Sequence, residues 1–279
     1  MKKLIRTCID IIDKPVVRHL LTPFVTGLAV AKNRSPFSLI YFHDGVWIHR
    51  QRGGAVVDRK VNFQTLEQFS WGTQETWGQV FSPKEGDTVI DVGAGIGSEI
   101  HYYSQMVGKM GKVVAIEAHP QTFACLKKFC ELNHLENVVP LHVAVGDHDG
   151  SVLINDRSDH IANSIMGVTA GAMVPLKTLD SIVDSLQLEK INFLKMNIEG
   201  AERLAIVGMQ TCISKIETLC ISCHDFIADS GGSDDLRTKS IVRAFLQENR
   251  FVIHERASDS RRWIRDQLSG MALERLTPC

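Results

Sequence analysis

The sequence predicts an α/β fold in which helices cover both faces of a doubly wound, mostly parallel sheet. One observation is a short apolar run that turns into a glycine-rich bend, at residues 88–97. A second apolar run, at residues 112–117, ends in an acidic residue. Strand and helix patterns then alternate towards the C-terminus. Parallel strands connected in this way need right-handed crossovers, which place helices on both faces of the sheet.

The front of the chain lacks this alternation. We therefore expect a small N-terminal extension at residues 1–80, followed by a main domain at residues 81–279. Apolar residues recur at helical spacing between residues 4 and 16, which predicts an amphipathic first helix. Alternating apolar and polar residues around two glycine turns predict an antiparallel hairpin or meander at residues 37–61. A helical bridge into the sheet is predicted at residues 64–81.

The main domain is expected to consist of strands, helices and one inserted hairpin. The strands are predicted at residues 88–92, 112–117, 138–145, 191–197, 217–223, 251–256 and 261–266. The helices are predicted at about residues 97–107, 120–133, 179–186, 201–212 and 236–249. The inserted hairpin is predicted at residues 151–154 and 173–176, around a polar loop at 155–171.

The charge of the chain restricts the classes of partner. The net charge is −1, which argues against a dedicated nucleic-acid binder, because such proteins are usually strongly basic. Residues 1–60, however, hold 11 Lys and Arg against 4 Asp. This basic front end fits a solvated face, an anionic membrane surface or an acidic substrate. No apolar run reaches the roughly 18 residues of a spanning helix. We expect a cytoplasmic protein, and we leave open peripheral membrane contact through the first helix and a homo-oligomer.

The seven cysteines are scattered without a disulfide framework, which fits a reducing compartment. Cys220, Cys223 and His224 match the attachment signature of c-type haem. The motif lies in an apolar run that predicts a strand, where residues three apart point to opposite faces. Both thiols could then not hold one group. We interpret the match as accidental, and the same geometry disfavours a metal site.

The glycine-rich bend distinguishes between nucleoside cofactors. A dinucleotide site prefers G-x-G-x-x-G, whereas Gly97 comes one residue early here. Asp91, at the strand end, would repel a pyrophosphate and suits a cationic group such as an amino-acid ammonium. Glu117, at the tip of the neighbouring strand, is placed to accept hydrogen bonds from both hydroxyls of a ribose. Together these features favour S-adenosylmethionine, with S-adenosylhomocysteine as the product, over a dinucleotide.

Five segments carry a resemblance to a known family. They are KEGDTVIDVGAGIG at 84–97, VAIEAHP at 114–120, VAVGD at 143–147, LKTLD at 176–180 and INFLKMNIEGAE at 191–202. The chain resembles the FkbM-type methyltransferases over roughly residues 80–256, and the last segment is the most family-specific. The resemblance implies the Rossmann-like class I methyltransferase fold, with seven strands of which the last is antiparallel. It also implies methyl transfer from S-adenosylmethionine, usually to hydroxyl groups of sugars or secondary metabolites.

The expected cofactor contacts follow the strand ends. The methionine part is expected to face Asp91 and the glycines, and Glu117 is expected to bind the ribose. Ala118 and the segment 143–144 would flank the adenine. The full set is Asp91, Gly93, Ala94, Gly95, Gly97, Glu117, Ala118, Val143, Ala144 and Asn197.

The catalytic candidates are His224, Asn197, Glu199 and Lys195. In the sheet order that the resemblance implies, the ends of the strands that carry them are neighbours. His224 is the first choice of base, because its unperturbed pKa lies near physiological pH; the alternative is a histidine satisfied by nearby backbone. Glu199 either takes part in catalysis or caps the following helix. Lys195 either points into the same crevice or is a buried, paired lysine.

One residue departs from the family pattern. Asn197 stands where the family commonly has Asp. Without that charge, a role as metal ligand or strong base is weakened. We therefore assign no metal ligand, and a divalent metal is a doubtful cofactor.

The sequence leaves three functions open. The main hypothesis is O-methylation of a glycan or another small-molecule acceptor, with no nucleic-acid partner. The alternatives are a methyltransferase for protein or RNA, and a degenerate, non-catalytic module that binds cofactor and scaffolds a biosynthetic complex. The acceptor pocket is expected to draw on residues 37–81 and on the polar loop. In that loop, His160, Asn163 and Ser164 either contact a sugar or lie in solvent.

Overall fold

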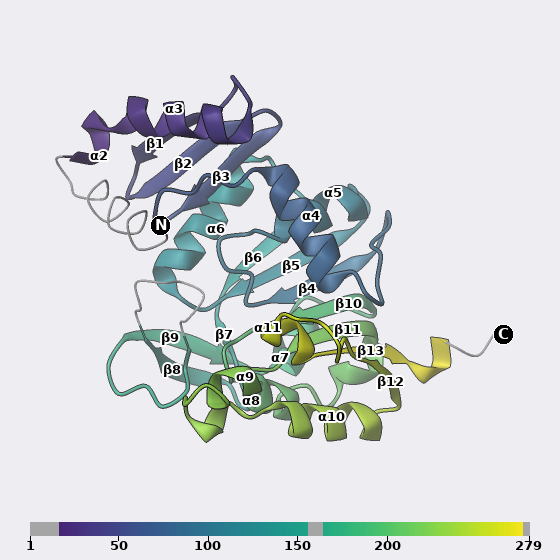
Figure 1. The fold of residues 1–279 in the computed structure, drawn as a ribbon. Coiled ribbons are helices and arrows are strands. Elements are labelled where there is room, and N and C mark those ends of the chain that lie inside the picture. Colours follow the sequence, from purple (N-terminus) through teal and green to yellow (C-terminus); the bar gives the residue numbers. More distant parts are fainter. Residues whose placement is uncertain (1–16, 156–163, 276–279) are drawn as a thin grey trace.

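The computed structural model describes residues 17–155 and 164–275. Within these residues, a seven-stranded sheet lies between two layers of helices (Figure 1). The strand order is β12-β13-β11-β10-β4-β5-β6, and β13 runs antiparallel to both of its neighbours. This order confirms the predicted doubly wound sheet with an antiparallel last strand. The strands are β4 (Thr88–Val92), β5 (Lys112–Glu117), β6 (Val138–His142), β10 (Ile191–Met196), β11 (Ile216–Ser222), β12 (Phe251–His254) and β13 (Gln267–Ala272).

Apolar side chains fill both faces of the sheet, as expected for parallel strands that are covered on two sides. On one face, Ile90 and Val92 of β4 pack with α7, α8 and α10. On the other face, Val89 packs with α4, α5 and α6. These helices are α4 (Leu66–Trp77), α5 (Ile100–Val107), α6 (Pro120–Leu132), α7 (Leu179–Ser185), α8 (Glu202–Val207) and α10 (Lys239–Glu248).

The chain winds in opposite directions from β4. Strands β5 and β6 follow on one side, and β10 and β11 follow on the other. In open sheets of this kind, ligands bind outside the carboxyl ends of the strands, where the winding reverses. That point lies between β4 and β10, where the glycine-rich bend follows β4.

The N-terminal extension is a helix packed on a three-stranded meander; a hairpin or meander was predicted here, but a helix at residues 22–33 was not. Its elements are α2 (Val17–Leu20), α3 (Thr22–Asn33), β1 (Leu39–His43), β2 (Val46–Gln51) and β3 (Gly54–Asp58). Val25 and Ala29 of α3 share a small core with Ile40 and Trp47 of the meander. The rest of the meander joins the core formed by α4, α5 and α6, so packing is continuous across residue 80. The predicted first helix at residues 4–16 lies outside the described residues.

The predicted inserted hairpin is present, but it recruits part of a predicted strand. Strands β7 (Ala144–Val145), β8 (Gly150–Ile154) and β9 (Ala172–Lys177) form a separate sheet in the order β7-β9-β8. The strand predicted at residues 138–145 is therefore divided, because β6 ends at His142 and β7 pairs with β9. The insertion lies beside the carboxyl ends of β4, β5 and β10 (Figure 1).

The last strand was predicted in the wrong place. Residues 262–265 form α11 (Arg262–Arg265), and β13 begins at Gln267. The strand contains Gly and Ala, which are depleted in strands, and lacks β-branched and aromatic residues, so the local pattern did not predict it. A Cβ at Gly270 would lie 3.1 Å from the Phe251 side chain and 3.2 Å from the Leu219 side chain, so close packing between neighbouring strands favours a small residue. The remaining short elements are η2 (Cys212–Lys215), α9 (Asp225–Ala228), η3 (Asp234–Leu236) and η4 (Leu273–Arg275).

Two predictions from the sequence concern thiols and membranes. Cys220 packs in the core on the α4 face of the sheet, and Cys223 packs in the core on the opposite face. This confirms that the two thiols point apart. None of the described helices combines the length and the hydropathy that a bilayer span requires.

Asn133 attaches the meander to the main domain. Its Oδ1 accepts a hydrogen bond from the Ala55 N–H at 2.8 Å. Its Nδ2 donates to the Ala55 carbonyl and to the Phe129 carbonyl, both at 2.8 Å. The Asn133 side chain, at the end of α6, therefore hydrogen-bonds both the N–H and the carbonyl of Ala55, a buried residue of β3.

We expect Asn133→Ala to lower the free energy of unfolding by about 2–3 kcal/mol, because both backbone groups of Ala55 lose their partner. Chemical denaturation measures the change. Asn249→Ala is the matched control, since Asn249 also follows a helix and donates to a carbonyl four residues earlier, that of Phe245. Its expected loss is below about 1 kcal/mol. Equal losses in the two variants would contradict this account of the attachment.

Candidate active site

A pocket lies at the point where the winding of the sheet reverses. It is formed by the carboxyl ends of β4, β5 and β10, by the segment that follows β6, and by the inserted sheet. Eight of the predicted site residues line it: Gly93, Gly95, Glu117, Ala118, Val143, Ala144, Asn197 and Glu199. Residues that were predicted from separate strand ends therefore lie together in one pocket.

Glu117 ends β5 and faces this pocket. Its Oε2 accepts a hydrogen bond from the Gly95 N–H at 2.9 Å, and its Oε1 accepts from the His119 N–H at 2.8 Å. Burial raises the pKa of Glu117 to about 7, against the opposing effect of these two hydrogen bonds. A carboxylate has about four acceptor positions, so Glu117 can accept further hydrogen bonds from a ligand.

The three glycines of the bend serve different purposes. Gly93 has φ of +80°, and a Cβ there would collide with the carbonyl oxygen of Asn197. Gly97 has φ of +96°, and its Cβ would lie 2.8 Å from the Phe129 ring. Only at Gly95 would a Cβ point into open space. The expected approach to a ligand therefore applies to Gly95, whereas the other two glycines permit packing within the protein.

Ala94 also belongs to the protein interior. It is 1% exposed, packs in the core on the α4 face, and its N–H donates to the Ile116 carbonyl. Ala94 and Gly97 do not line the pocket. Both residues form the bend instead. Their position away from the pocket does not support the expected contact with the cofactor.

Asp91 and Lys195 form a buried ion pair beneath the bend. The Lys195 Nζ lies 2.7 Å from the Asp91 Oδ1 and donates to the Gly93 carbonyl at 2.8 Å. Burial lowers the pKa of Lys195, but the carboxylates of Asp91, Glu99 and Glu117 together outweigh it and raise that pKa above its ordinary value. The charge of Asp91 is therefore balanced by the protein itself. The expected contact of Asp91 with a ligand ammonium does not fit this geometry, and Lys195 takes the alternative role of a buried, paired lysine.

His224 lies between two carboxylates. Its Nδ1 is 2.9 Å from the Glu202 Oε1, and its Nε2 is 3.3 Å from the Glu199 Oε1. Burial lowers the pKa of His224, but the two carboxylates outweigh this and raise it to about 10. The imidazole is therefore protonated at neutral pH and cannot accept another proton. This argues against His224 as the base, because the unperturbed pKa on which that choice rested does not apply between Glu199 and Glu202.

The turn after β10 places Glu199 in the pocket. Glu199 has φ of +53°, which is unusual for a residue with a Cβ and is typical of functional turns. The capping role considered for Glu199 is not seen, because no side chain caps the N-terminus of α8. Glu202 instead holds the turn before α8, since its Oε1 accepts from the N–H groups of Ile198 and Gly200, both at 3.3 Å. The Glu199 carboxylate faces the pocket and His224.

The inserted sheet and its loop contribute two lining residues that the sequence pattern did not predict, Ile154 and Ile165, together with Ser164, which was considered as a sugar contact. Ile154 and Ile165 supply an apolar wall. Ser164 lines the pocket and donates a hydrogen bond to the Glu199 carbonyl at 2.9 Å. The sequence contained a signal for these lining residues, because the predicted hairpin follows directly after the predicted adenine contacts at residues 143–144. His160 and Asn163 lie outside the described residues.

The described residues contain no group of three or more His, Cys, Asp or Glu that could hold a metal ion. At the position where a metal ligand was considered, the side chain is the uncharged amide of Asn197, which lines the pocket. Its backbone N–H donates to the Val92 carbonyl at 2.9 Å and joins β4 to β10.

The chain is similar to the hexuronic acid methyltransferase AglP of Haloferax volcanii, with 24% identity over 181 residues that cover 63% of this chain and 73% of that protein. It is also similar to the catalytic subunit TRM61 of the Yarrowia lipolytica tRNA (adenine(58)-N(1))-methyltransferase. That match has 39% identity over 59 residues, which cover 21% of this chain and 15% of that protein.

A crystal structure of a methyltransferase FkbM from Methylobacillus flagellatus is similar at 17% identity and a TM-score of 0.48. The match covers 74% of this chain and 50% of that one, so this chain spans half the length of that relative. The model of the methyltransferase FkbM domain matches residues 91–253, which is more than half of the chain. The chain therefore belongs to the FkbM methyltransferase family.

Proposed function

We propose that this methyltransferase transfers the methyl group of S-adenosylmethionine to a hydroxyl group of a sugar-containing acceptor. The observation that carries the proposal is the Glu117 carboxylate, which lines a pocket at the reversal of the sheet and keeps acceptor positions for two ribose hydroxyls. Family membership supports methyl transfer. The similarity to a hexuronic acid methyltransferase supports a sugar acceptor.

The described residues fit this cofactor. Glu117 would hold the ribose, the apolar side chains of Ala118 and Val143 would flank the adenine, and the open space at Gly95 would admit the amino-acid part. When bound, S-adenosylmethionine supplies a methyl group that its sulfonium makes electrophilic.

Glu199 is the proposed acceptor of the hydroxyl proton. Its carboxylate lines the pocket, and its side chain is 20% exposed, so an acceptor can reach it. The His224 imidazolium contacts the Glu199 carboxylate through its Nε2, and its Nδ1 contacts the Glu202 carboxylate. His224 is therefore a positioning residue. The protein has two tasks, to align the hydroxyl with the methyl group and to accept its proton as charge develops.

Calorimetry with S-adenosylmethionine and S-adenosylhomocysteine, followed by turnover assays with hexose and hexuronate acceptors, tests the proposal directly. We expect both compounds to bind and at least one sugar acceptor to be methylated. If neither compound binds, or if a nicotinamide dinucleotide stabilises the protein instead, the proposal is wrong.

The affinity for S-adenosylmethionine is expected to be about tenfold weaker at pH 6 than at pH 8. Ribose hydroxyls donate to the charged form of Glu117, and its pKa of about 7 means that it is protonated below neutral pH. Binding lowers this pKa, so protons compete with the cofactor at acidic pH. Calorimetry across this pH range measures the dependence.

Glu117→Gln supplies the control for this pH dependence. The variant cannot become charged, so its affinity should be about 10–100-fold weaker at pH 8 and nearly constant down to pH 6. An unchanged pH dependence in Glu117→Gln would assign the effect to another group.

Glu199→Gln is expected to lower kcat by about 100-fold or more, because the amide cannot accept the hydroxyl proton. Its affinity for S-adenosylmethionine should change only a few-fold. Glu189→Gln, an exposed change in the loop before β10, is the matched control and should keep full activity. A Glu199→Gln variant with normal kcat would exclude this residue as the proton acceptor.

A further inference from the structure

A second cavity lies on the α4 face of the sheet. Its free space is about 580 Å³, and it is bounded by the segment 78–82 after α4 and by strands β12 and β13. Gln267 and Ser269 of β13 line it together with the apolar side chains of Phe81 and Met271. None of the predicted site residues lines this α4 cavity.

The strand register relates the α4 cavity to the active site. Asp91, Lys195, Cys220 and Ser269 occupy one row across β4, β10, β11 and β13. This row carries the buried ion pair beneath the glycine bend at one end and the cavity at the other. Gln267 lies two positions nearer the carboxyl edge. With strands about 4.8 Å apart, Gln267 is about 10 Å from β10, whose end leads into the turn of Glu199.

Gln267 is the polar group that indicates a ligand. Its side chain is 4% exposed and lines the cavity. Within residues 17–155 and 164–275, the backbone of Gln267 pairs with Ser222, but no hydrogen bond reaches its side-chain amide. The amide is not among the fully enclosed polar atoms that lack a partner, so it faces the free space of the cavity, where a ligand can reach it. Nearby, the Ser269 hydroxyl donates to the Cys220 Sγ at 3.3 Å and keeps its own acceptor positions.

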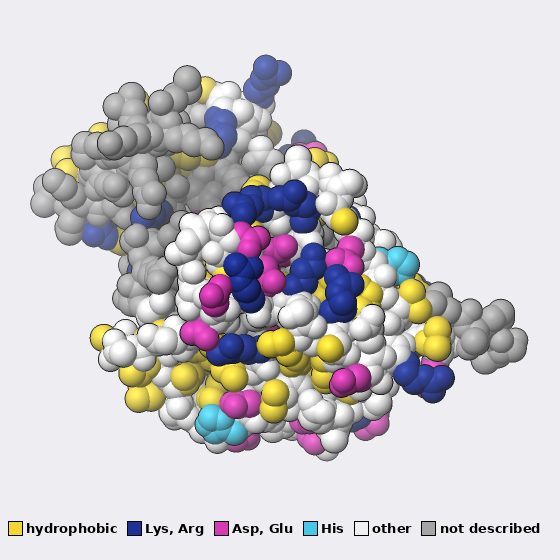
Figure 2. All heavy atoms as spheres, turned by 60° about the horizontal axis from the view of Figure 1, so that its bottom comes forward, with side chains coloured by type: hydrophobic (Ala, Val, Ile, Leu, Met, Phe, Trp, Pro, Cys, Tyr) yellow, Lys and Arg dark blue, Asp and Glu magenta, His cyan; other side chains and the backbone are white. Residues whose placement is uncertain are grey.

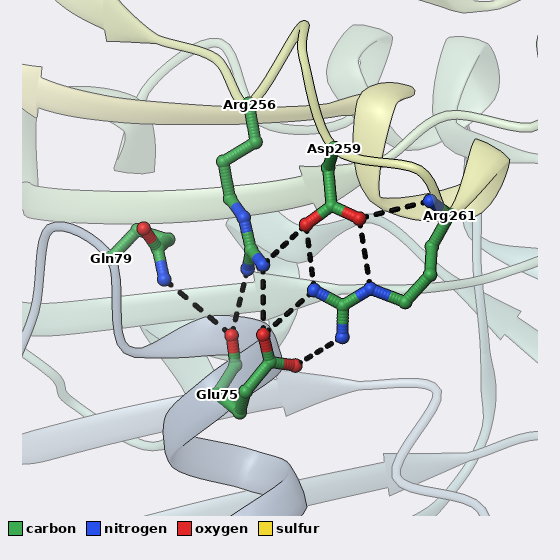
Figure 3. Close-up of polar contacts among 5 residues, drawn as sticks. All are labelled: Glu75, Gln79, Arg256, Asp259 and Arg261. Carbon is green, nitrogen blue, oxygen red and sulfur yellow. Dashed lines mark hydrogen bonds and ion pairs between the residues drawn. The ribbon is translucent and has the colours of Figure 1, made fainter.

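A cluster of four charged residues fixes one wall of the α4 cavity (Figure 3). Arg256, which lines the cavity, donates to the backbone oxygen of Glu75 at 2.7 Å and to the Glu75 carboxylate at 2.8 Å. Arg261 also donates to the Glu75 carboxylate, and Asp259 accepts from both arginines. The hydrogen bonds from Arg261 and Arg256 lower the pKa of Glu75 to about 2, so the cluster stays charged. It holds the connection between β12 and β13 against the end of α4.

The same connection is also held from its other side. Figure 2 shows Lys and Arg side chains gathered with Asp and Glu side chains in the middle of one face of the molecule. Among the described residues, Glu255 accepts from Arg243 and Lys239 of α10 at 2.7 and 3.2 Å. Ion pairs therefore contact the connection that forms one wall of the cavity from two directions.

We propose that the α4 cavity binds a non-reacting sugar ring of the acceptor, while the hydroxyl that reacts lies near Glu199. This inference rests on the proposed function and names a binding site for its acceptor. The amide of Gln267 and the hydroxyl of Ser269 both donate and accept, as sugar hydroxyls require. The apolar surfaces of Phe81 and Met271 suit the C–H faces of the ring. The distance of about 10 Å to the end of β10 fits an acceptor of two linked rings.

The test is a titration of the ¹⁵N-labelled protein with cellobiose and with D-glucuronate, followed by NMR. The side-chain amide resonance of Gln267 is identified by its loss in Gln267→Leu, which keeps the volume of the side chain. We expect at least one of the two sugars to shift this resonance. In Gln267→Leu, the affinity of the protein for that sugar should fall about tenfold. The KM for a sugar acceptor that the enzyme methylates should rise by a similar factor.

The affinity of Gln267→Leu for S-adenosylmethionine and its melting temperature should match the wild type. Gln247→Ala, an exposed change on α10, is the matched control and should leave sugar binding unchanged. The inference is overturned if both sugars leave the Gln267 amide unmoved, or if Gln267→Leu keeps full affinity. Sugar binding at Gln267 without binding of S-adenosylmethionine would overturn the proposed function and keep the sugar site, so the two failures are distinguishable.

Discussion

The buried ion pair between Lys195 and Asp91 is the interaction on which the arrangement of the site depends. It joins β10 to β4 at the point where the sheet reverses its winding, and Lys195 also holds the Gly93 carbonyl of the bend. Both side chains are almost completely buried, so each charge needs the other. Removal of one partner of such a pair typically costs about 3–5 kcal/mol, because the remaining charge stays in the interior. The position of the bend, and with it Gly95, therefore depends on this contact.

A second charged cluster organises the opposite side of the pocket. His224, at the end of β11, lies between Glu199 and Glu202 of the turn after β10. One imidazolium fixes one carboxylate in the pocket and another in the protein interior. The two clusters share a principle, since in each of them a buried cation joins neighbouring strand ends. They differ in exposure, because only Glu199 presents a carboxylate to a ligand.

Local patterns predicted the strands of the sheet well, and they predicted its last strand poorly. The segments Val89–Ile90 and Val113–Ile116 are apolar on both faces, so burial alone identifies them as strands. At Gly270 of β13, a Cβ would lie only 3.1 Å from the Phe251 side chain and 3.2 Å from the Leu219 side chain, so these neighbours would have to shift. Such a constraint exists only once the strands are paired. The local sequence pattern therefore predicted this strand in the preceding segment, which forms α11.

In the site, too, local sequence decided some features and tertiary structure decided others. The order of residues by itself determined that Gly93, Gly95, Glu117, Asn197 and Glu199 would meet in one pocket, because the carboxyl ends of parallel strands share an edge. The charge state of each group was decided only by tertiary structure. Asp91 became an internal partner of Lys195, and His224 became a cation between two carboxylates. A pKa depends on burial and on charges within a few ångströms, and these distances are set by packing between segments that are far apart in the chain.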